Sequence, residues 1–488
     1  MSAMRVRPVR VLVALLLGAA ASAHNGAAQQ PLTLREAVAL AQGQGLQAEA
    51  ARASRDAARF RDGAFKGSLL PQLSVGGTLP NYNRSIISVL QPDGSAGFRP
   101  QNQTDAALTA TLSQRLPTGG DLFVSSSLAT LQVSGQQSFR TYSTTPVTIG
   151  VRQQLFRPNL LALDRREQPV RLDISERQFL EAREDVALQT TALYFDVHAA
   201  RLSVANATAN VAVNDTLFRL NSGRFEVGKI GENDLLQSEL ALLRARNALD
   251  ASVLAVERAE AALRLGIRLP AGAPLALDVS QPVPDFPVDT AVAVREAMRN
   301  RASVAGAELQ QIQAQRRVTE AKLNNGIGAT LDASYGFNAT ASQFNQAYTN
   351  LLEAQRFRLG VEVPIVRWGA GRSTVQAAEA DRDQAAATAK QTLEQTALEA
   401  RFAVRELILA RRQLQIAAKA DTVAAKRFEV AYNRYVVGRI TVDNLYLAQS
   451  EKDGAVAAYA QALRGHWLAL YRVRRLTLFD FEVGAGIR

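Results

Sequence analysis

The sequence predicts an α+β membrane protein in which strands with one lipid-facing side continue into very long helices. Three observations lead to this fold class. Apolar residues recur every seven positions over long segments, which is typical of helices packed lengthwise. Two shorter regions instead alternate apolar and polar residues, which is typical of strands with one apolar face. Both patterns occur once in each half of the 488-residue chain, which predicts two internal structural repeats.

The N-terminus has the pattern of a secretory signal peptide over residues 1–23. Three arginines precede an apolar stretch from Val11 to Ala21, and Ala21-Ser22-Ala23 is a small-x-small cleavage site. The apolar stretch is shorter than the roughly 20 residues that a helix needs to cross a bilayer. We therefore expect an exported protein. Because no later segment is long and apolar enough for a transmembrane helix, we expect strands to make any bilayer crossing.

The composition excludes several kinds of site and partner. The chain has no cysteine, which excludes disulfides, thiolate-metal sites and attachment of lipid to an N-terminal cysteine. The three histidines (His24, His198 and His466) are far apart, so we expect no metal site and no cofactor. The net charge is +11, but the arginines are spread among glutamates along the helical segments. Without a basic cluster beside stacking aromatics, we expect no nucleic-acid partner.

Self-similarity divides the chain into two halves. Two pairs of segments share an offset of 210 (434 − 224): Arg224–Ile230 with Arg434–Ile440, and Gln153–Arg157 with Val363–Arg367. Near the start of each half, Arg35-Glu36-Ala37 matches Arg295-Glu296-Ala297 at an offset of 260 (295 − 35). The fall in offset predicts an insertion of about 50 residues (260 − 210) in the first half, between its first helix and its second strand region.

We therefore expect a first repeat over residues 24–265 and a second over 290–481. A proline-rich linker over 266–289 joins them, and 482–488 form a C-terminal tail. Each repeat is predicted to contain a helix, strands, a very long helix, a short break and a second long helix. The expected ranges are strands at about 73–156 with long helices at 166–222 and 232–265 in the first repeat, and strands at about 327–366 with long helices at 372–436 and 441–476 in the second.

Seven-residue stripes predict the long helices. The stripes are Val197, Val204, Val211 and Phe218; Leu235, Leu242, Leu249, Val256 and Leu263; and Leu393, Ala400, Leu407 and Leu414, resumed at Phe428 and Tyr435. A helix over 166–222 is roughly 85 Å long at ~1.5 Å per residue. A rod of that length cannot fold back into a compact domain, so we expect it to form part of a tube wall.

The strand regions predict a β-barrel that is shared between subunits. We expect four strands in the first half, at about 73–79, 107–116, 122–131 and 147–156, and two in the second. Alternatively, the turn at 116–121 closes an extra hairpin outside the barrel wall. The polar segments 82–105, 134–146 and 338–350 are predicted to be loops. An amphipathic sheet over a soluble core has the same alternation, but the export signal and the rods favour the barrel. So few strands cannot enclose a water-filled pore alone.

Several segments resemble the TolC, or outer membrane factor, family. Leu32–Ala41 (Leu-Thr-Leu-Arg-Glu-Ala-Val-Ala-Leu-Ala) resembles its opening, and Val361–Arg372 resembles its strand-to-helix entry. Gly228 and Gly438, each preceded by Arg-aromatic and followed by an Asp-containing helix start, resemble its two periplasmic hairpin tips. The likeness runs from Pro31 to about Phe481. It implies a homotrimer whose transmembrane β-barrel in the outer membrane continues into a long periplasmic α-helical coiled-coil barrel.

The resemblance also implies partners and a closable tip. An adaptor (membrane fusion) protein and an inner-membrane transporter would dock at the tip. The residues that it implies for docking are Val227, Gly228, Lys229, Ile230, Val437, Gly438, Arg439 and Ile440. Tyr435 matches the family's gate tyrosine, and Asp234 matches the aspartate that this tyrosine contacts. We expect Tyr435 and Arg439 to bind Asp234 in the closed state. The alternative is that Tyr435 is only the next residue of the apolar stripe after Phe428.

The chain departs from the family pattern beyond the second tip glycine. Ile440 stands where the family archetype has an arginine, with Arg439 beside it. Asn444 stands where it has an aspartate, with Asp443 beside it, and a further aspartate is replaced by Leu447. Arg439, Asp443 and Asn444 are therefore gate candidates together with Tyr435 and Asp234, without the family's acidic ring.

No residues are arranged for catalysis, so we expect no enzyme. Carboxylate pairs such as Glu181 with Glu184 lie among arginines on helical segments, which predicts solvated surfaces. The predicted function is an outer-membrane channel subunit that serves as exit duct of an efflux or type I secretion system. The alternative is a periplasmic coiled-coil adaptor, which explains the export signal and the rods but not the strand regions in both halves. The sequence does not indicate the substrate, although a lumen lined by arginines would favour anions.

Overall fold

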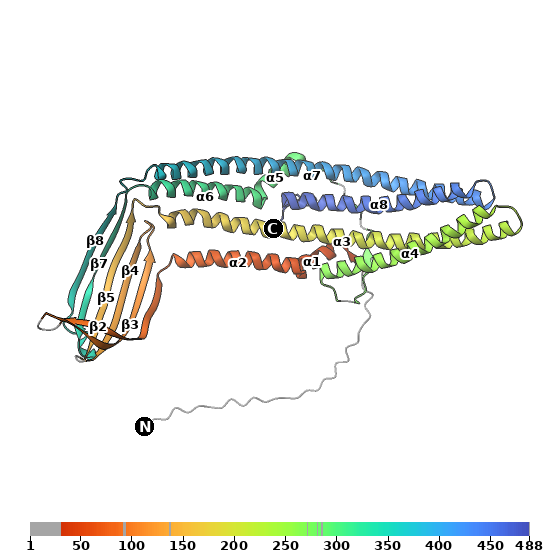
Figure 1. Cartoon of the computed structure of the whole chain (residues 1–488). Helices are drawn as coiled ribbons and strands as arrows, with labels where there is room; N and C mark the ends of the chain where they lie inside the picture. Colours follow the sequence, from red (N-terminus) through yellow and green to blue (C-terminus); the bar gives the residue numbers. More distant parts are fainter. Residues whose placement is uncertain are drawn as a thin grey trace, which may run out of the picture.

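The molecule is elongated, with a six-stranded sheet at one end (Figure 1). Long helices extend from this sheet to two turns at the opposite end of the molecule. The computed structural model describes residues 31–90, 94–135, 138–270, 272–280, 282–284 and 286–487. The expected signal peptide over 1–23 lies outside these residues. Among the residues described, no helix combines the length and the apolar character that a membrane crossing requires.

Every neighbouring pair in the sheet is antiparallel, and the strand order is β2-β3-β4-β5-β7-β8. The strands are β2 (Gln72–Leu90), β3 (Ala96–Arg115), β4 (Asp121–Ser134), β5 (Phe139–Leu155), β7 (Gly328–Ala341) and β8 (Leu352–Glu362). β4 pairs with both β3 and β5. The turn at 116–120 therefore closes a hairpin inside the sheet, and the alternative of a hairpin outside the wall is wrong.

The strands are longer than the sequence predicts. β2 and β3 continue through much of the segment 82–105, which we predicted to be a loop, and β4 and β5 enter the segment 134–146 in the same way. The cause is backbone pairing, which does not depend on side-chain polarity. Ser85 pairs with Gln101, for example, and both have polar side chains. Of the three expected polar loops, 338–350 is the one that lies mostly outside strands, with a short 3-10 helix at Phe344–Gln346.

The sheet has one apolar face and one polar face. Successive register partners across five strands, from β2 to β7, are Leu73, Leu112, Val124, Ile149 and Tyr335 on one face, and Ser74, Thr111, Ser125, Thr148 and Gly336 on the other. On the apolar face Leu73, Leu112, Ile149 and Tyr335 keep 41–72% of their surface exposed. The predicted alternation is present, and in a single chain its apolar side faces solvent.

The eight helices of the described residues form four pairs of equal length. α3 (Leu160–Glu226) and α7 (Ala370–Val436) have 67 residues each, or about 100 Å. The other pairs are α4 (Glu232–Ile267) with α8 (Val442–Thr477), α1 (Leu34–Gln44) with α5 (Thr290–Asn300), and α2 (Leu46–Ser68) with α6 (Ala302–Asn324). α3 begins six residues before the expected position because Asn159 caps it, accepting a hydrogen bond from the Ala162 amide.

The single helix expected at the start of each half is in fact two helices. The backbone is extended at Gly45, between α1 and α2, and at Arg301, between α5 and α6. As a result the shorter helices follow one another along α3 and α7, which run the whole length of the helical body without a break (Figure 1).

One of the sequence matches between the halves is displaced by a helical turn. The starts of α1 and α5 differ by 256 residues (290 − 34), as do those of α2 and α6 (302 − 46), whereas the starts of the long helices differ by 210 (370 − 160). Arg35 is the second residue of α1, but Arg295 is the sixth residue of α5. The buried Ala37 and Ala41 correspond to the buried Ala293 and Ala297. The offset of 260 was therefore wrong by four residues, and the extra length is 46 residues (256 − 210); the β3–β4 hairpin, Ala96–Ser134, supplies most of it.

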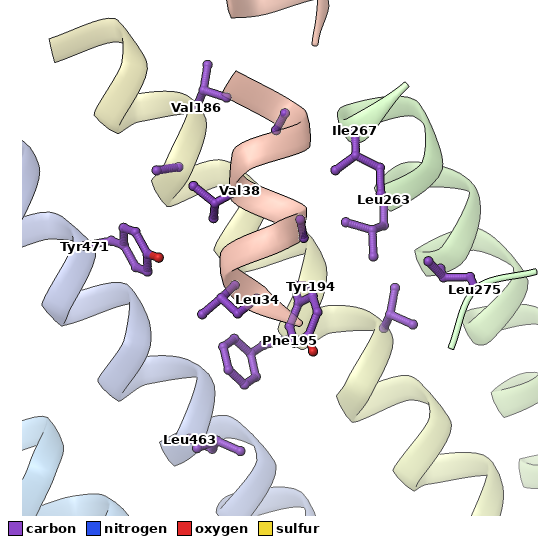
Figure 2. Close-up of a cluster of buried hydrophobic side chains, with 14 of the residues drawn as sticks. Leu34, Val38, Val186, Tyr194, Phe195, Leu263, Ile267, Leu275, Leu463 and Tyr471 are labelled. Carbon is purple, nitrogen blue, oxygen red and sulfur yellow. The ribbon is translucent and has the colours of Figure 1, made fainter. Parts of the chain in front are cut away.

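The largest apolar cluster lies midway along the helices, where α1, α3, α4 and α8 meet (Figure 2). Tyr194 and Phe195 of α3 pack beside Leu263 and Ile267 of α4 and Leu34 of α1. The single proton of the Tyr194 hydroxyl is shared between the carbonyl oxygens of Asp278 (2.7 Å) and Leu32 (3.0 Å). Burial raises the pKa of this tyrosine. These bonds hold β1 (Leu32–Thr33) and β6 (Leu277–Asp278), which pair in parallel, against the helices.

Glu184 lies in the interior, although we predicted a solvated surface for it. Its side chain is 2% exposed, and its Oε2 lies 3.3 Å from Nε of Arg474. Arg474 also bonds Asp480 at 2.7 Å. Burial raises the pKa of Glu184 and outweighs the lowering by Arg474. The carboxylate therefore ties α3 to the end of α8.

Candidate functional site: the paired helix turns

Two short turns at the end of the helical body connect α3 to α4 and α7 to α8 (Figure 1). Gly228 and Gly438 have φ of +69° and +71°, a left-handed conformation that glycine adopts without strain. The turns are closed by the same two backbone bonds: the Gly228 and Lys229 amides donate to Phe225 and Arg224, and the Gly438 and Arg439 amides donate to Tyr435 and Arg434, at 2.8–2.9 Å. Both helices thus end in the same glycine cap.

The two turns are joined to each other within the chain. Nη2 of Arg224 donates to the carbonyl oxygen of Val436 at 2.9 Å, and its guanidinium lies 5.2 Å from the centre of the Tyr435 ring. Nε2 of Gln237, on α4, donates to Oδ1 of Asp443, on α8, at 2.7 Å. α3 is thus joined to α7, and α4 to α8, by hydrogen bonds in which one partner is charged.

Tyr435, the expected gate tyrosine, lies in the interior of the chain. It is 5% exposed and packs with Leu217, Val442 and Leu445 in an apolar cluster. Its hydroxyl donates to Oδ1 of Asn221 at 2.7 Å, and not to Asp234. Within one chain, the structure therefore favours the alternative in which Tyr435 is a buried residue of the apolar stripe.

The other gate candidates lie nearer the surface. Asp234 is half-buried in the first turn of α4, and no bond from its carboxylate to another described residue is found. Arg439 is exposed, again without a side-chain bond to any residue that the structure describes. The Asp443 carboxylate accepts from Gln237, and Asn444 donates to the Thr441 hydroxyl at 3.0 Å. The structure thus brings Asp443 into a contact and leaves Asp234 and Arg439 without one in this part of the chain.

The expected docking residues form the outermost surface of the two turns. Val227 and Val437 are exposed over 67% and 66% of their surface, and Lys229 and Arg439 are exposed beside them. Ile440 differs, because it packs against the cluster around Tyr435. Nowhere in the described ranges do three histidine or carboxylate side chains come together as metal ligands would.

Comparisons with known proteins give the fold. No family model and no curated protein matches the sequence. The structure, however, is similar to the CmeC outer membrane channel of Campylobacter jejuni, with 17% identity and a TM-score of 0.66 over 93% of this chain and 86% of that one. It is also similar to the outer membrane protein VceC of Vibrio cholerae (14% identity, TM-score 0.64, 93% and 97% coverage) and to the open state of the MtrE outer membrane channel of Neisseria gonorrhoeae (14%, 0.62, 93% and 89%).

This chain has the outer membrane channel fold. The resemblance to the TolC family that the sequence indicates is thereby confirmed at the level of the fold. In this channel fold the two glycine turns lie at the end of the helices opposite to the sheet.

Sequence reasoning missed the buried asparagines of α3, of which Asn221 is the partner of Tyr435 near the turns. Asn210, Asn214 and Asn221 are all buried. Asn210 and Asn206 donate to the two carboxylate oxygens of Asp453 on α8, at 2.6 and 2.8 Å. The available signal was the spacing of four and seven residues between the three buried asparagines, which places them on one helix face.

Proposed function

We propose that the chain is one of three identical subunits of an outer-membrane channel, the passive exit duct of a tripartite efflux or type I secretion system. The observation that carries this proposal is the amphipathic sheet, whose apolar face is exposed and whose edge strands, β2 and β8, each have one edge without a partner strand in the described part of the chain. Open edges and an uncovered apolar face are costly in water. Both are accommodated when copies join edge to edge in lipid.

The number of strands supports a pore. Three copies of a six-stranded sheet supply eighteen strands (3 × 6). Barrels of roughly 16–18 strands leave an aqueous channel, whereas about eight strands are filled by side chains. The polar face of the sheet, with residues such as Ser74, Thr111 and Thr148, is then the lining of the transmembrane β-barrel.

The helices support a continuous tube below the barrel. α7 buries one seven-residue stripe in its own chain and exposes another on the opposite side. The exposed stripe consists of large apolar side chains that are 43–66% exposed: Phe402, Leu409, Ile416, Val423 and Val430, continued by Val437 just beyond the helix. Such a stripe packs lengthwise against a neighbouring helix. We infer that it contacts the next copy, and that the helices close into a coiled-coil barrel that extends into the periplasm.

The equal lengths of the four helix pairs favour two internal repeats, over about 24–265 and 290–481, joined by the linker 266–289. We infer that the turns at the end of the tube dock a periplasmic adaptor, which links the channel to an inner-membrane transporter. The exposed Val227 and Val437 are the apolar part of this surface. The chain acts without enzymatic chemistry, and without a lipid anchor on cysteine, since it has no cysteine.

For the gate, we infer contacts between copies and not within one chain. Tyr435 is already bonded to Asn221, whereas Asp234 and Arg439 keep charged groups available at the turns. An ion pair between Asp234 of one copy and Arg439 of the next, at the exposed turns, would stabilise a closed ring by about 0.2–1 kcal/mol per pair. Asp443 and Asn444 lie on the same turn of α8 and complete the set of gate candidates.

Fractionation and conductance test the proposal. The full-length protein is expressed with its own signal peptide in a Gram-negative host, and the membranes are separated by density. We expect a trimer in the outer membrane that dissociates on heating, and stepwise conductance after insertion into planar bilayers. A protein that fractionates with the inner membrane and gives no conductance would identify the alternative, a periplasmic adaptor.

A further inference from the structure

We propose that the junction between the two halves of one chain is the template for the junction between copies. In this arrangement β8 pairs with β2 of the next copy in a single register, with Val363 opposite Val75. The inference rests on the proposed function, because it requires copies that close into a ring. It adds the residue-level geometry of the seam.

The junction inside the chain involves strands and helices. β5, the last strand of the first half, pairs with β7, the first strand of the second half, with Gln153 opposite Leu331. Beside it α3 packs on α6, where Nη1 of Arg316 lies 2.7 Å from Oδ1 of Asp164 and 3.0 Å from Oε1 of Glu167. Glu167 is buried here. At the internal junction, β5 and the long helix α3 that follows it thus contact β7 and the shorter helix α6 that precedes it.

The same elements are the ones left open at the two edges of the chain. At one edge lie β8, the last strand of the six-stranded sheet, and α7, the helix that follows it; at the other lie β2, the first strand of that sheet, and α2, the helix that precedes it. The correspondence between them is fixed by spacing. α6 ends at Asn324 and β7 starts at Gly328, while α2 ends at Ser68 and β2 starts at Gln72, so both boundaries differ by 256 residues. The starts of α3 and α7 differ by 210.

Applying these two offsets to the internal junction gives the register between copies. Gln153 corresponds to Val363 (153 + 210), and Leu331 corresponds to Val75 (331 − 256). The antiparallel pairing then places Ile365 opposite Leu73, and Leu359 opposite Leu79. Residues 363–365 lie beyond the end of β8 in the single chain, and in the ring they continue the strand.

The apolar face independently checks that this register places like faces of the two strands side by side. Val75, Leu73 and Leu79 are all exposed on β2, and so are the residues Leu359, Val363 and Ile365 that the register places opposite them. A slip of one residue would set Val363 opposite Ser74, on the polar face, and would turn the whole row away from its partner. The copied register therefore continues the apolar face of the sheet across the seam without a break.

The helices beside the strands explain an exposed aromatic residue. The counterpart of Arg316 on α2 is Phe60 (316 − 256), and the counterparts of Asp164 and Glu167 on α7 are Thr374 and Ala377, which are small, uncharged and exposed. Phe60 is 76% exposed in the single chain. In the ring it takes the place that Arg316 occupies at the internal junction, against the next copy's α7. The ionic cluster of the internal junction is thus replaced, between copies, by the phenyl group of Phe60, which packs on small side chains of the next copy.

Disulfide trapping tests the register, because the natural chain has no cysteine. Val75→Cys with Val363→Cys is expected to give covalent dimers and trimers on oxidation, since opposed residues of antiparallel strands have Cα atoms about 4.5–5.5 Å apart, within disulfide range. Three controls accompany it. Each single variant should stay monomeric after denaturation, Ser74→Cys with Val363→Cys should cross-link weakly because the side chains face opposite sides, and Gln153→Cys with Leu331→Cys should close within one chain.

The outcomes separate this inference from the proposed function. If the reduced double variant forms trimers in the outer membrane, but cross-links only in a register displaced by two or more residues, the inference is overturned and the channel stands. If neither the natural chain nor the variants form oligomers, the proposed function fails. A variant that does not assemble is replaced by Phe60→Cys with Ala377→Cys, joined by a short bis-maleimide, which probes the helix side of the same seam.

Discussion

The bond between Tyr435 and Asn221 allows an experimental test of the two interpretations of the expected gate tyrosine. Removing the hydroxyl with Tyr435→Phe leaves Oδ1 of Asn221 in a buried site without its donor. Nδ2 of Asn221 also has no partner among the described residues. A buried amide that loses its bond costs about 1–3 kcal/mol. Replacing both partners, Tyr435→Phe with Asn221→Leu, leaves no unpaired group, so most of this cost should be recovered.

The expected coupling between Tyr435 and Asn221 is therefore about 1–3 kcal/mol, or roughly 5- to 150-fold in the equilibrium for opening the turn. Hydrogen exchange of the segment 428–442, measured by mass spectrometry in the assembled channel, reports this equilibrium. Tyr432→Phe is the matched control, because no bond from that hydroxyl to another described residue is found. We expect no comparable coupling between Tyr435→Phe and Asp234→Ala. A coupling to Asp234 that exceeds the coupling to Asn221 would refute the reasoning and restore the tyrosine lock.

Three further predictions follow from single residues. Gly228→Ala should destabilise its turn by about 1 kcal/mol, because the φ of +69° disfavours any residue with a Cβ although the space around the position is open. Gly223→Ala, in open space within α3, should instead stabilise the helix by about 0.5–1 kcal/mol. Thermal unfolding followed by circular dichroism measures both changes. Leu409→Glu, on the exposed stripe, should prevent assembly at a cost of about 1.5–3 kcal/mol per copy but keep the circular dichroism signal of the helices. Leu414→Glu, in the interior of the chain, should lose that signal. If both variants behave alike in sedimentation and circular dichroism, the assignment of the stripe is wrong. Burial raises the pKa of Glu184 above its ordinary value of 4.5. The contribution of Glu184 to the free energy of unfolding is therefore fully present below pH 4.5 and declines as the pH rises through the folded-state pKa. Glu184→Gln should remove this decline from unfolding measurements between about pH 4 and 8.

The helices could be predicted from the sequence because their buried faces repeat every seven residues. Ala400, Leu407 and Leu414 are buried, as are Val197 and Leu263, each on a predicted stripe. The break at Gly45 was missed because one extended residue interrupts a helix without changing the apolar pattern around it. The Arg-Glu-Ala match failed for a related reason: a helix repeats its surface after about four residues, so a match displaced by one turn still aligns similar faces.

The strands and the site were harder to predict. Segments rich in Ser, Asn and Gln extend β2 and β3, because a hairpin satisfies its backbone groups with any side chains, and side-chain pattern is the only signal that the sequence carries. At the turns, the role of Tyr435 came from the resemblance, which gives a family's partner and not this chain's partner. Asn221 is 214 residues away from Tyr435, and no local pattern connects the two positions.

α1 begins at Leu34 and α4 ends at Ile267 in the cluster around Tyr194 and Phe195, whereas α3 and α7 continue past this cluster in both directions without a break. From Val197 to the end of α3 is 29 residues (226 − 197), or roughly 45 Å of rigid rod. A change of direction of about 5° at the middle of the body would thus move the far turns sideways by about 4 Å over that lever arm. In the proposed tube, the packing around Tyr194 and Phe195 would therefore affect the width of the far opening as much as the residues of the turns do.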